Sequence, residues 1–128
     1  MIGRALLVAI PLAALVVALS TDAPALQTGG GPSQAQMNEK ARREYKKADV
    51  TLNRAYERLA KALEPGPRAR LRAAELAWLR FRDAESEFRA SEFKGATLQP
   101  AARLGYLEDL TRRRTKELVD AYKQFAGD

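Results

Sequence analysis

The stretch Glu64-Pro65-Gly66-Pro67 decides the fold, because it interrupts a long run of sequence with helical character. Two prolines and a glycine within four residues deny the backbone further helical hydrogen bonds. The chain is therefore expected to reverse direction here. The segments on either side should form two antiparallel helices, since a short connection leaves no room for the chain to return to its starting end.

The segment before this turn repeats its apolar residues at steps of four and three, which predicts one long amphipathic helix. Ser33 and Gln36 stand three residues apart at its start, the spacing of a capping box. The repeating positions are Met37, Ala41, Tyr45, Ala48, Leu52, Tyr56, Leu59 and Leu63.

A second helix is expected from about Pro67 to Phe93, followed by Gly95, which takes the left-handed conformation without a side-chain clash. A short loop over residues 96–99 then leads to Pro100, which suits the first turn of a third helix. The expected stripe of the second helix is Leu71, Ala74, Trp78, Phe81, Glu85 and Phe88. The expected inner face of the third is Leu104, Leu107, Thr111, Arg114, Leu118, Ala121 and Phe125.

The spacing of the apolar residues in these three segments predicts an all-α fold. We expect an elongated antiparallel up-down-up bundle of three helices that occupies residues 34–126. The regular spacing would also suit an intermolecular coiled coil, so a homodimer is an open alternative. The residues expected in the core are Leu52, Tyr56, Trp78, Phe81 and Leu118.

The N-terminus has the pattern of an export signal. Residues 5–19 are all apolar and directly follow Arg4, and small residues come after them. This pattern predicts a signal peptide over residues 1–25, with cleavage after Ser20 or Ala25.

An uncleaved membrane anchor is the alternative for this leader. It is disfavoured because the apolar run is shorter than the ~20 residues of a spanning helix and contains Pro11. Residues 26–33 are small, polar and rich in glycine, so we expect a flexible spacer before the folded domain.

Composition excludes most enzyme chemistry. The chain contains neither histidine nor cysteine, and therefore lacks an imidazole base, a thiolate nucleophile and soft metal ligands. Asp83, Glu85 and Glu87 would formally allow a carboxylate-pair glycosidase, but arginines surround them at helical spacing, which indicates a solvated charged face. We predict no enzyme, no catalytic residues, no metal and no cofactor.

The chain is basic, with a formal net charge of +6. Such a charge favours encounter with anionic partners, such as cell-envelope polymers or a lipid surface. Nucleic acid would suit the same charge, but export argues against it as a partner.

A set of polar residues lies on or beside the apolar stripes, where packing alone would place aliphatic side chains. An inward carboxylate is tolerated when a guanidinium meets it, and either of two arginines could meet Asp49. The set is expected either to fix the register of the helices or to form a ligand site. Its members are Asp49, Asn53, Arg82, Thr111 and Arg114.

Three blocks give the chain a family resemblance. They are Met37-Asn38 with Asp49-x-x-Leu52-Asn53-x-x-Tyr56, then Trp78-x-x-Phe81-Arg82-Asp83-Ala84-Glu85, then Leu110-Thr111-x-x-Arg114-Thr115-x-Glu117-Leu118. Together they resemble the lysozyme inhibitor LprI-like family. The resemblance implies an exported, helical bacterial envelope protein and a role in blocking lysozyme. Where such relatives commonly place cysteines, this chain has Lys40, Ser86 and Tyr106.

The first functional hypothesis is therefore a non-enzymatic periplasmic or secreted protein that inhibits a lysozyme-type muramidase by protein contact. Its contact residues are expected at the two turns, at Glu64, Lys94 and Thr97. One alternative is a cationic helical protein that binds anionic envelope polymers or lipid. Another is a structural or chaperone-like module of the periplasm.

Overall fold

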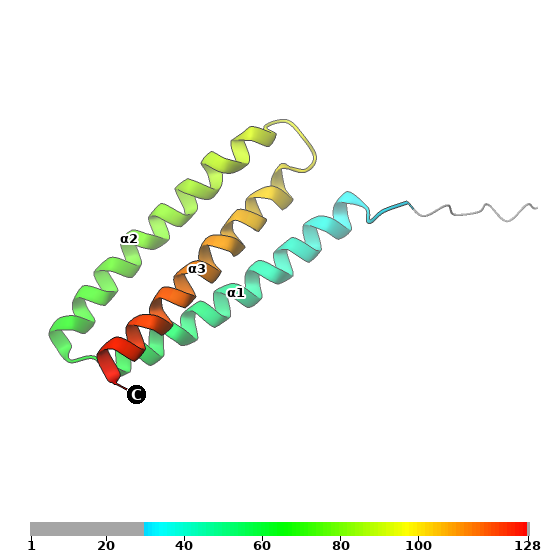
Figure 1. Cartoon of the computed structure of the whole chain (residues 1–128). Helices are drawn as coiled ribbons and strands as arrows, with labels where there is room; N and C mark the ends of the chain where they lie inside the picture. Colours follow the sequence, from blue (N-terminus) through cyan, green and yellow to red (C-terminus); the bar gives the residue numbers. More distant parts are fainter. Residues whose placement is uncertain (1–29, 128) are drawn as a thin grey trace, which may run out of the picture.

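The computed structural model describes residues 30–127, which form three long helices (Figure 1). They are α1 (Gln34–Ala62), α2 (Pro65–Ala90) and α3 (Gln99–Ala126), with a short 3₁₀ turn, η1 (Ser91–Phe93), after α2. This part of the chain contains no strand, so the predicted all-α fold is confirmed. The expected signal peptide and the first residues of the expected spacer lie outside the described residues.

Both ends of α1 are closed by side chains. Gln36 N donates to Ser33 Oγ at 3.2 Å and Ser33 N donates to Gln36 Oε1 at 2.8 Å, which confirms the predicted capping box. At the other end, Arg68 donates to the carbonyl oxygens of Ala60 and Leu63, both at 2.8 Å. These bonds satisfy backbone groups that a helix terminus leaves without an intrahelical partner.

The bounds of α2 differ from the prediction at both ends. The helix begins at Pro65, two residues early, because a proline in the first turn sacrifices no hydrogen bond. It ends at Ala90 and tightens into η1 before the turn at Gly95, which has a φ of 82°. Pro100 lies in the first turn of α3, as predicted.

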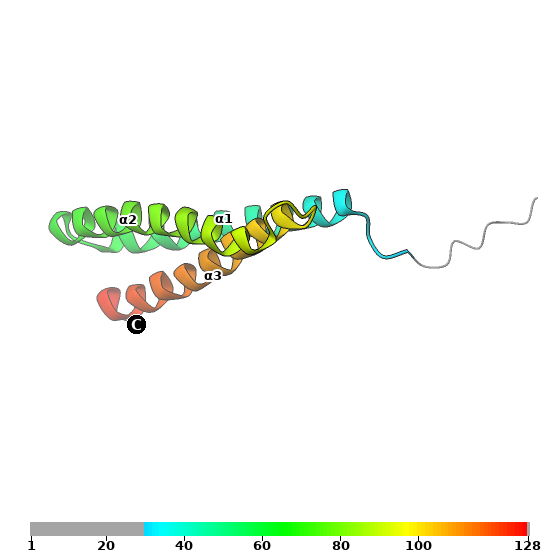
Figure 2. The same ribbon diagram turned by 90° about the horizontal axis from the view of Figure 1, so that it is seen from above.

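The chain direction alternates from helix to helix, and the assembly is elongated (Figure 1). α3 packs most extensively along α1 and less extensively against α2, whereas α1 and α2 approach each other little. Figure 2 shows α3 separating from α2 toward its C-terminus. A groove of about 430 Å³ lies where α2 and α3 diverge. Aliphatic side chains such as Leu71 and Leu118 make up most of its lining.

The core lies where α1 and α3 meet. Its buried cluster is Leu52, Leu59, Leu63 and Leu118. Tyr56 and Trp78 are partly buried and pack against this cluster. Phe81, however, is 53% exposed, so its expected place in the core is wrong.

The error at Phe81 arises because α2 turns a different face inward. Its buried residues are Glu75, Arg82, Ser86 and Ala90, while Phe88 is 72% exposed. The observed face is displaced by one residue from the expected stripe, which amounts to about 100° around the helix. Polar side chains therefore occupy the interior face of α2, and its phenylalanines lie outside.

Candidate functional site

Two arginines flank the indole ring of Trp78 in the interior. The guanidinium carbon of Arg82 lies 5.4 Å from the ring centroid, and that of Arg114 lies 5.8 Å from it. The two arginine side chains are only 9% and 16% exposed. A cation within about 6 Å of an indole ring is attracted by the ring's negative face. Trp78 therefore lies within cation–π distance of one arginine of α2 and one of α3.

Arg82 connects α2 to α1. Its Nη1 lies 3.4 Å from Asp49 Oδ1, while its Nε and Nη2 lie 3.0 and 2.9 Å from Asp83 Oδ1. The guanidinium carbon also lies 5.6 Å from the Tyr45 ring centroid. The structure thus brings Asp49 and Arg82 together, but the shorter contacts of Arg82 are with its sequence neighbour.

Arg114 connects α3 to α2. Its Nε and Nη2 both lie 3.0 Å from Glu75 Oε2, and its Nη1 lies 3.0 Å from Glu117 Oε2. Glu75 did not feature in the sequence prediction. The one signal for it is spacing, because Glu75 precedes Trp78 by three residues and Arg82 by seven and so shares their helix face.

Two expected members of the polar network lie outside it. Asn53 is exposed and its side chain makes no hydrogen bond among the described residues, so the prediction that it joins the interior set is wrong, although it lies one helical turn from Asp49. Thr111 is fully buried, but within the described part of the chain its hydroxyl has no hydrogen-bond partner. The Thr111 carbonyl accepts a bond of 3.0 Å from Thr115 Oγ1.

The turn residues expected to contact a partner are all exposed, but they lie at opposite ends of the molecule (Figure 1). Glu64 stands between α1 and α2, and its carbonyl accepts a backbone bond of 2.9 Å from Arg68. Lys94 and Thr97 stand between α2 and α3. Among the described residues, the side chains of these two make no hydrogen bond or ion pair. The two turns therefore cannot belong to one compact contact site, and a partner would contact each turn separately.

Most of the basic residues in the runs 42–43, 46–47 and 112–114 pair with acids one helical turn away. Arg42 and Arg43 pair with Glu39 at 2.9 and 3.4 Å, and Lys47 pairs with Glu44 at 3.0 Å. The clusters on α3 are paired in the same way, Arg112 with Glu108 and Arg113 with Asp109. The hydrogen bond from Lys47 lowers the pKa of the Glu44 carboxyl below its ordinary value.

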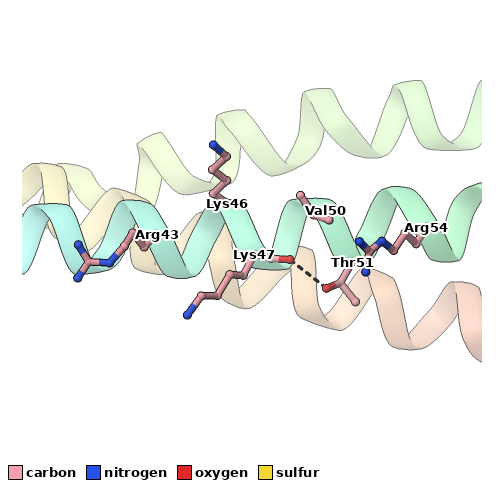
Figure 3. A pocket seen from close by; sticks show the side chains of 6 residues that line it. All are labelled: Arg43, Lys46, Lys47, Val50, Thr51 and Arg54. Carbon is pink, nitrogen blue, oxygen red and sulfur yellow. Dashed lines mark hydrogen bonds between the residues drawn. The ribbon is translucent and has the colours of Figure 1, made fainter.

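One cationic surface on α1 is only partly compensated, because two of its four basic residues, Arg43 and Lys47, form the ion pairs given above. On the outer side of α1, Arg43, Lys46, Lys47 and Arg54 surround a shallow hollow of about 450 Å³ whose floor includes Val50 and Thr51 (Figure 3). Within the described residues, Lys46 and Arg54 make no ion pair. The Thr51 hydroxyl donates to the carbonyl of Lys47 at 2.9 Å.

The part of the chain that the structure describes contains no group of three or more acidic residues able to hold a metal ion. None of its helices combines the length and apolar character that crossing a bilayer requires. The polar features of the described residues are therefore ion pairs between charged side chains and two exposed turns.

Comparison with known proteins identifies the family. The lysozyme inhibitor LprI family matches residues 27–118, more than half of the chain, and the chain belongs to this family. An uncharacterized protein of Rhizobium meliloti (strain 1021) is 31% identical over 101 residues, which cover 69% of this chain and 73% of that protein. No solved structure shows a significant match.

The positions at which the resemblance implies cysteines hold different side chains here. Lys40 is exposed. Ser86 is fully buried, and its hydroxyl donates to the carbonyl of Asp83 at 2.8 Å. The guanidinium carbon of Arg89 lies 5.7 Å from the Tyr106 ring centroid. A hydrogen bond and a cation–π contact therefore occur at two of these three positions, and the chain has no cysteine.

Proposed function

We propose that this protein is exported from a bacterial cell and blocks a lysozyme-type muramidase by protein contact, without a reaction of its own. The observation that carries this proposal is the family match over residues 27–118, which includes α1, α2 and most of α3. The apolar leader after Arg4 supports export.

The turn between α2 and α3 is the better candidate for contact with the enzyme. Glycosidases of this kind cleave their substrate with a pair of carboxyl groups. The ammonium group of Lys94 could pair with such a carboxylate, whereas Glu64 at the opposite turn carries the same sign of charge. Thr97 and the 40% exposed Leu98 lie on the same turn and would fill space that a glycan otherwise occupies.

A turbidity assay of cell-wall lysis tests this proposal. The exported protein, in molar excess, should slow lysis by lysozyme, and the double variant Lys94→Ala/Thr97→Ala should lose most of this effect while keeping its helical circular dichroism. Glu64→Ala, which changes an exposed residue at the other turn, should inhibit as the unchanged protein does. Undiminished lysis at a large excess of the unchanged protein would refute the proposal.

The cationic hollow on α1 supports a second candidate function, which is binding to anionic envelope material. Lys46 and Arg54 present charge that no neighbouring acid in the described chain offsets (Figure 3). Retention on anionic vesicles should then fall as salt rises, and Lys46→Glu/Arg54→Glu should abolish it. Binding that ignores both salt and the substitution would exclude this electrostatic mechanism.

A further inference from the structure

The outer side of α2 carries an exposed apolar stripe, of which only Ala74 also lines the groove between the helices. Phe81 and Phe88 are 53% and 72% exposed, and Ala74, Ala77 and Ala84 are exposed between and before them. These five residues, here called the outer stripe, follow one another at steps of three, four, three and four. α2 forms one edge of the assembly, with α3 between it and α1 in the view of Figure 1.

The outer stripe has the spacing of a coiled-coil seam. In heptad terms, Ala74, Phe81 and Phe88 take one core position, and Ala77 and Ala84 take the other. Two phenylalanines and one alanine thus occupy the first position, and alanines alone occupy the second. To fill the space evenly, a partner helix must place a small side chain opposite each large one and a large side chain opposite each small one.

A second copy of α2 offers that order when it runs antiparallel. Parallel pairing would place phenylalanine against phenylalanine and alanine against alanine, which forces alternately wide and narrow separations. Antiparallel pairing places the two different core positions in one layer. Phe81 then meets Ala84 of the second copy, and Phe88 meets Ala77 of the second copy, so one axial separation suits each of these phenylalanine–alanine layers.

The charges beside the outer stripe agree with the same arrangement. Arg80 and Glu87 both flank the stripe on one side, at equivalent heptad positions. In the antiparallel register above, Arg80 of each copy lies beside Glu87 of the other, so two ion pairs form by symmetry. Arg80 is exposed and makes no ion pair among the described residues, and the 61% exposed Glu87 also bonds Arg103.

We propose that two copies of this chain associate through the outer stripe of α2, antiparallel, with each phenylalanine packed on an alanine of the other copy. The seam from Ala74 to Phe88 is about 22 Å long. An interface of this length is small, so the dimer should form in a concentration-dependent manner, with a Kd on the order of 1 μM to 1 mM. This association does not depend on lysozyme inhibition.

Sedimentation equilibrium of the exported protein over a range of concentrations tests the proposal. The mass should rise from that of one chain to that of two. Phe81→Glu and Phe88→Glu change exposed side chains, so helix content should persist while the Kd rises at least about tenfold. Val119→Glu places the same charge on an exposed apolar residue of α3 and should leave the dimer unchanged.

A charge exchange tests the antiparallel register. Arg80→Glu alone should weaken the dimer by placing two acids together, and adding Glu87→Arg should restore it. A single-chain mass at every concentration would overturn the proposal, as would a dimer that Phe81→Glu leaves intact. Failure of the exchanged pair to restore association would overturn the antiparallel arrangement.

Discussion

Glu75 of α2 and Arg114 of α3 form an ion pair in which two guanidinium nitrogens lie 3.0 Å from one carboxylate oxygen. Their side chains are only 10% and 16% exposed, so water screens the pair little. Since α2 buries polar rather than aliphatic side chains, this pair and the contact of Arg82 with Asp49 hold its middle against the other helices.

Breaking this pair should therefore destabilise the fold. We expect Glu75→Gln to lower the free energy of unfolding by about 2–3 kcal/mol, because it leaves a largely buried guanidinium without its main carboxylate. Glu117 still neutralises part of that charge, which limits the loss. Urea denaturation measures the change. The control is Asp120→Asn, which breaks an exposed ion pair with Lys116 and should not lower stability comparably. Equal urea midpoints for Glu75→Gln and the unchanged protein would contradict the stabilising role of the Glu75–Arg114 pair.

Arg68 should stabilise the end of α1 by bonding the carbonyls of Ala60, in its last turn, and of Leu63, its C-cap residue. Arg68→Ala is expected to lower the free energy of unfolding by about 1 kcal/mol, a modest value because the bonds are partly exposed to water. Arg68→Lys should recover only part of this, since an ammonium lacks the fork that reaches both oxygens. Arg70→Ala serves as the control, because Arg70 makes no such bond in the described chain. Thermal melts that rank Arg68→Ala with Arg70→Ala would argue against a capping role.

The buried hydroxyl of Thr111 should reduce stability, because no partner within residues 30–127 compensates for its removal from water. Replacing Thr111 with valine keeps the branched shape and removes the orphaned polar atom. We expect a gain of about 1 kcal/mol in the free energy of unfolding. Thr115→Val, which removes a hydroxyl that is hydrogen-bonded, should bring no gain. A loss of stability in Thr111→Val would show that the hydroxyl has a partner in solution.

Tyr45 should make the fold sensitive to alkali. Burial raises the pKa of its phenol above the ordinary value of 10.0, and the nearby Arg82 offsets part of this rise. A folded pKa above the unfolded one means that the folded state holds its proton longer, so its contribution to stability is present below pH 10.0 and is lost as pH rises toward the folded pKa. Urea midpoints measured at about pH 9 and pH 11 should fall less in Tyr45→Phe than in the unchanged protein. The same fall in both proteins would exclude this source of alkaline sensitivity.

The helices and turns could be predicted because their signals are local. Prolines and glycines mark the turns, Ser33 and Gln36 mark the start of α1, and the apolar period of α1 leads directly to Leu52 and Leu59. None of these signals needs knowledge of another helix.

The inward face of α2 could not be predicted in the same way. Phe81 and Phe88 outweigh Glu75, Arg82 and Ser86 in any count of apolar side chains, yet burial here depends on what the neighbouring helices supply. Carboxylates and guanidiniums on α1 and α3 make the polar face the better one to bury. The choice of Glu75 as the partner of Arg114 depends on the relative register of α2 and α3, which no single segment contains.

The extensive contact between α1 and α3 also affects how the chain reaches its fold. These two helices are separated by residues 63–98, so the main core forms only after a loop of 36 residues has closed. Closing such a loop loses entropy before the apolar contacts compensate for it, and non-local contacts slow folding. This protein should therefore fold more slowly than a helical protein of similar size whose main contacts join consecutive helices.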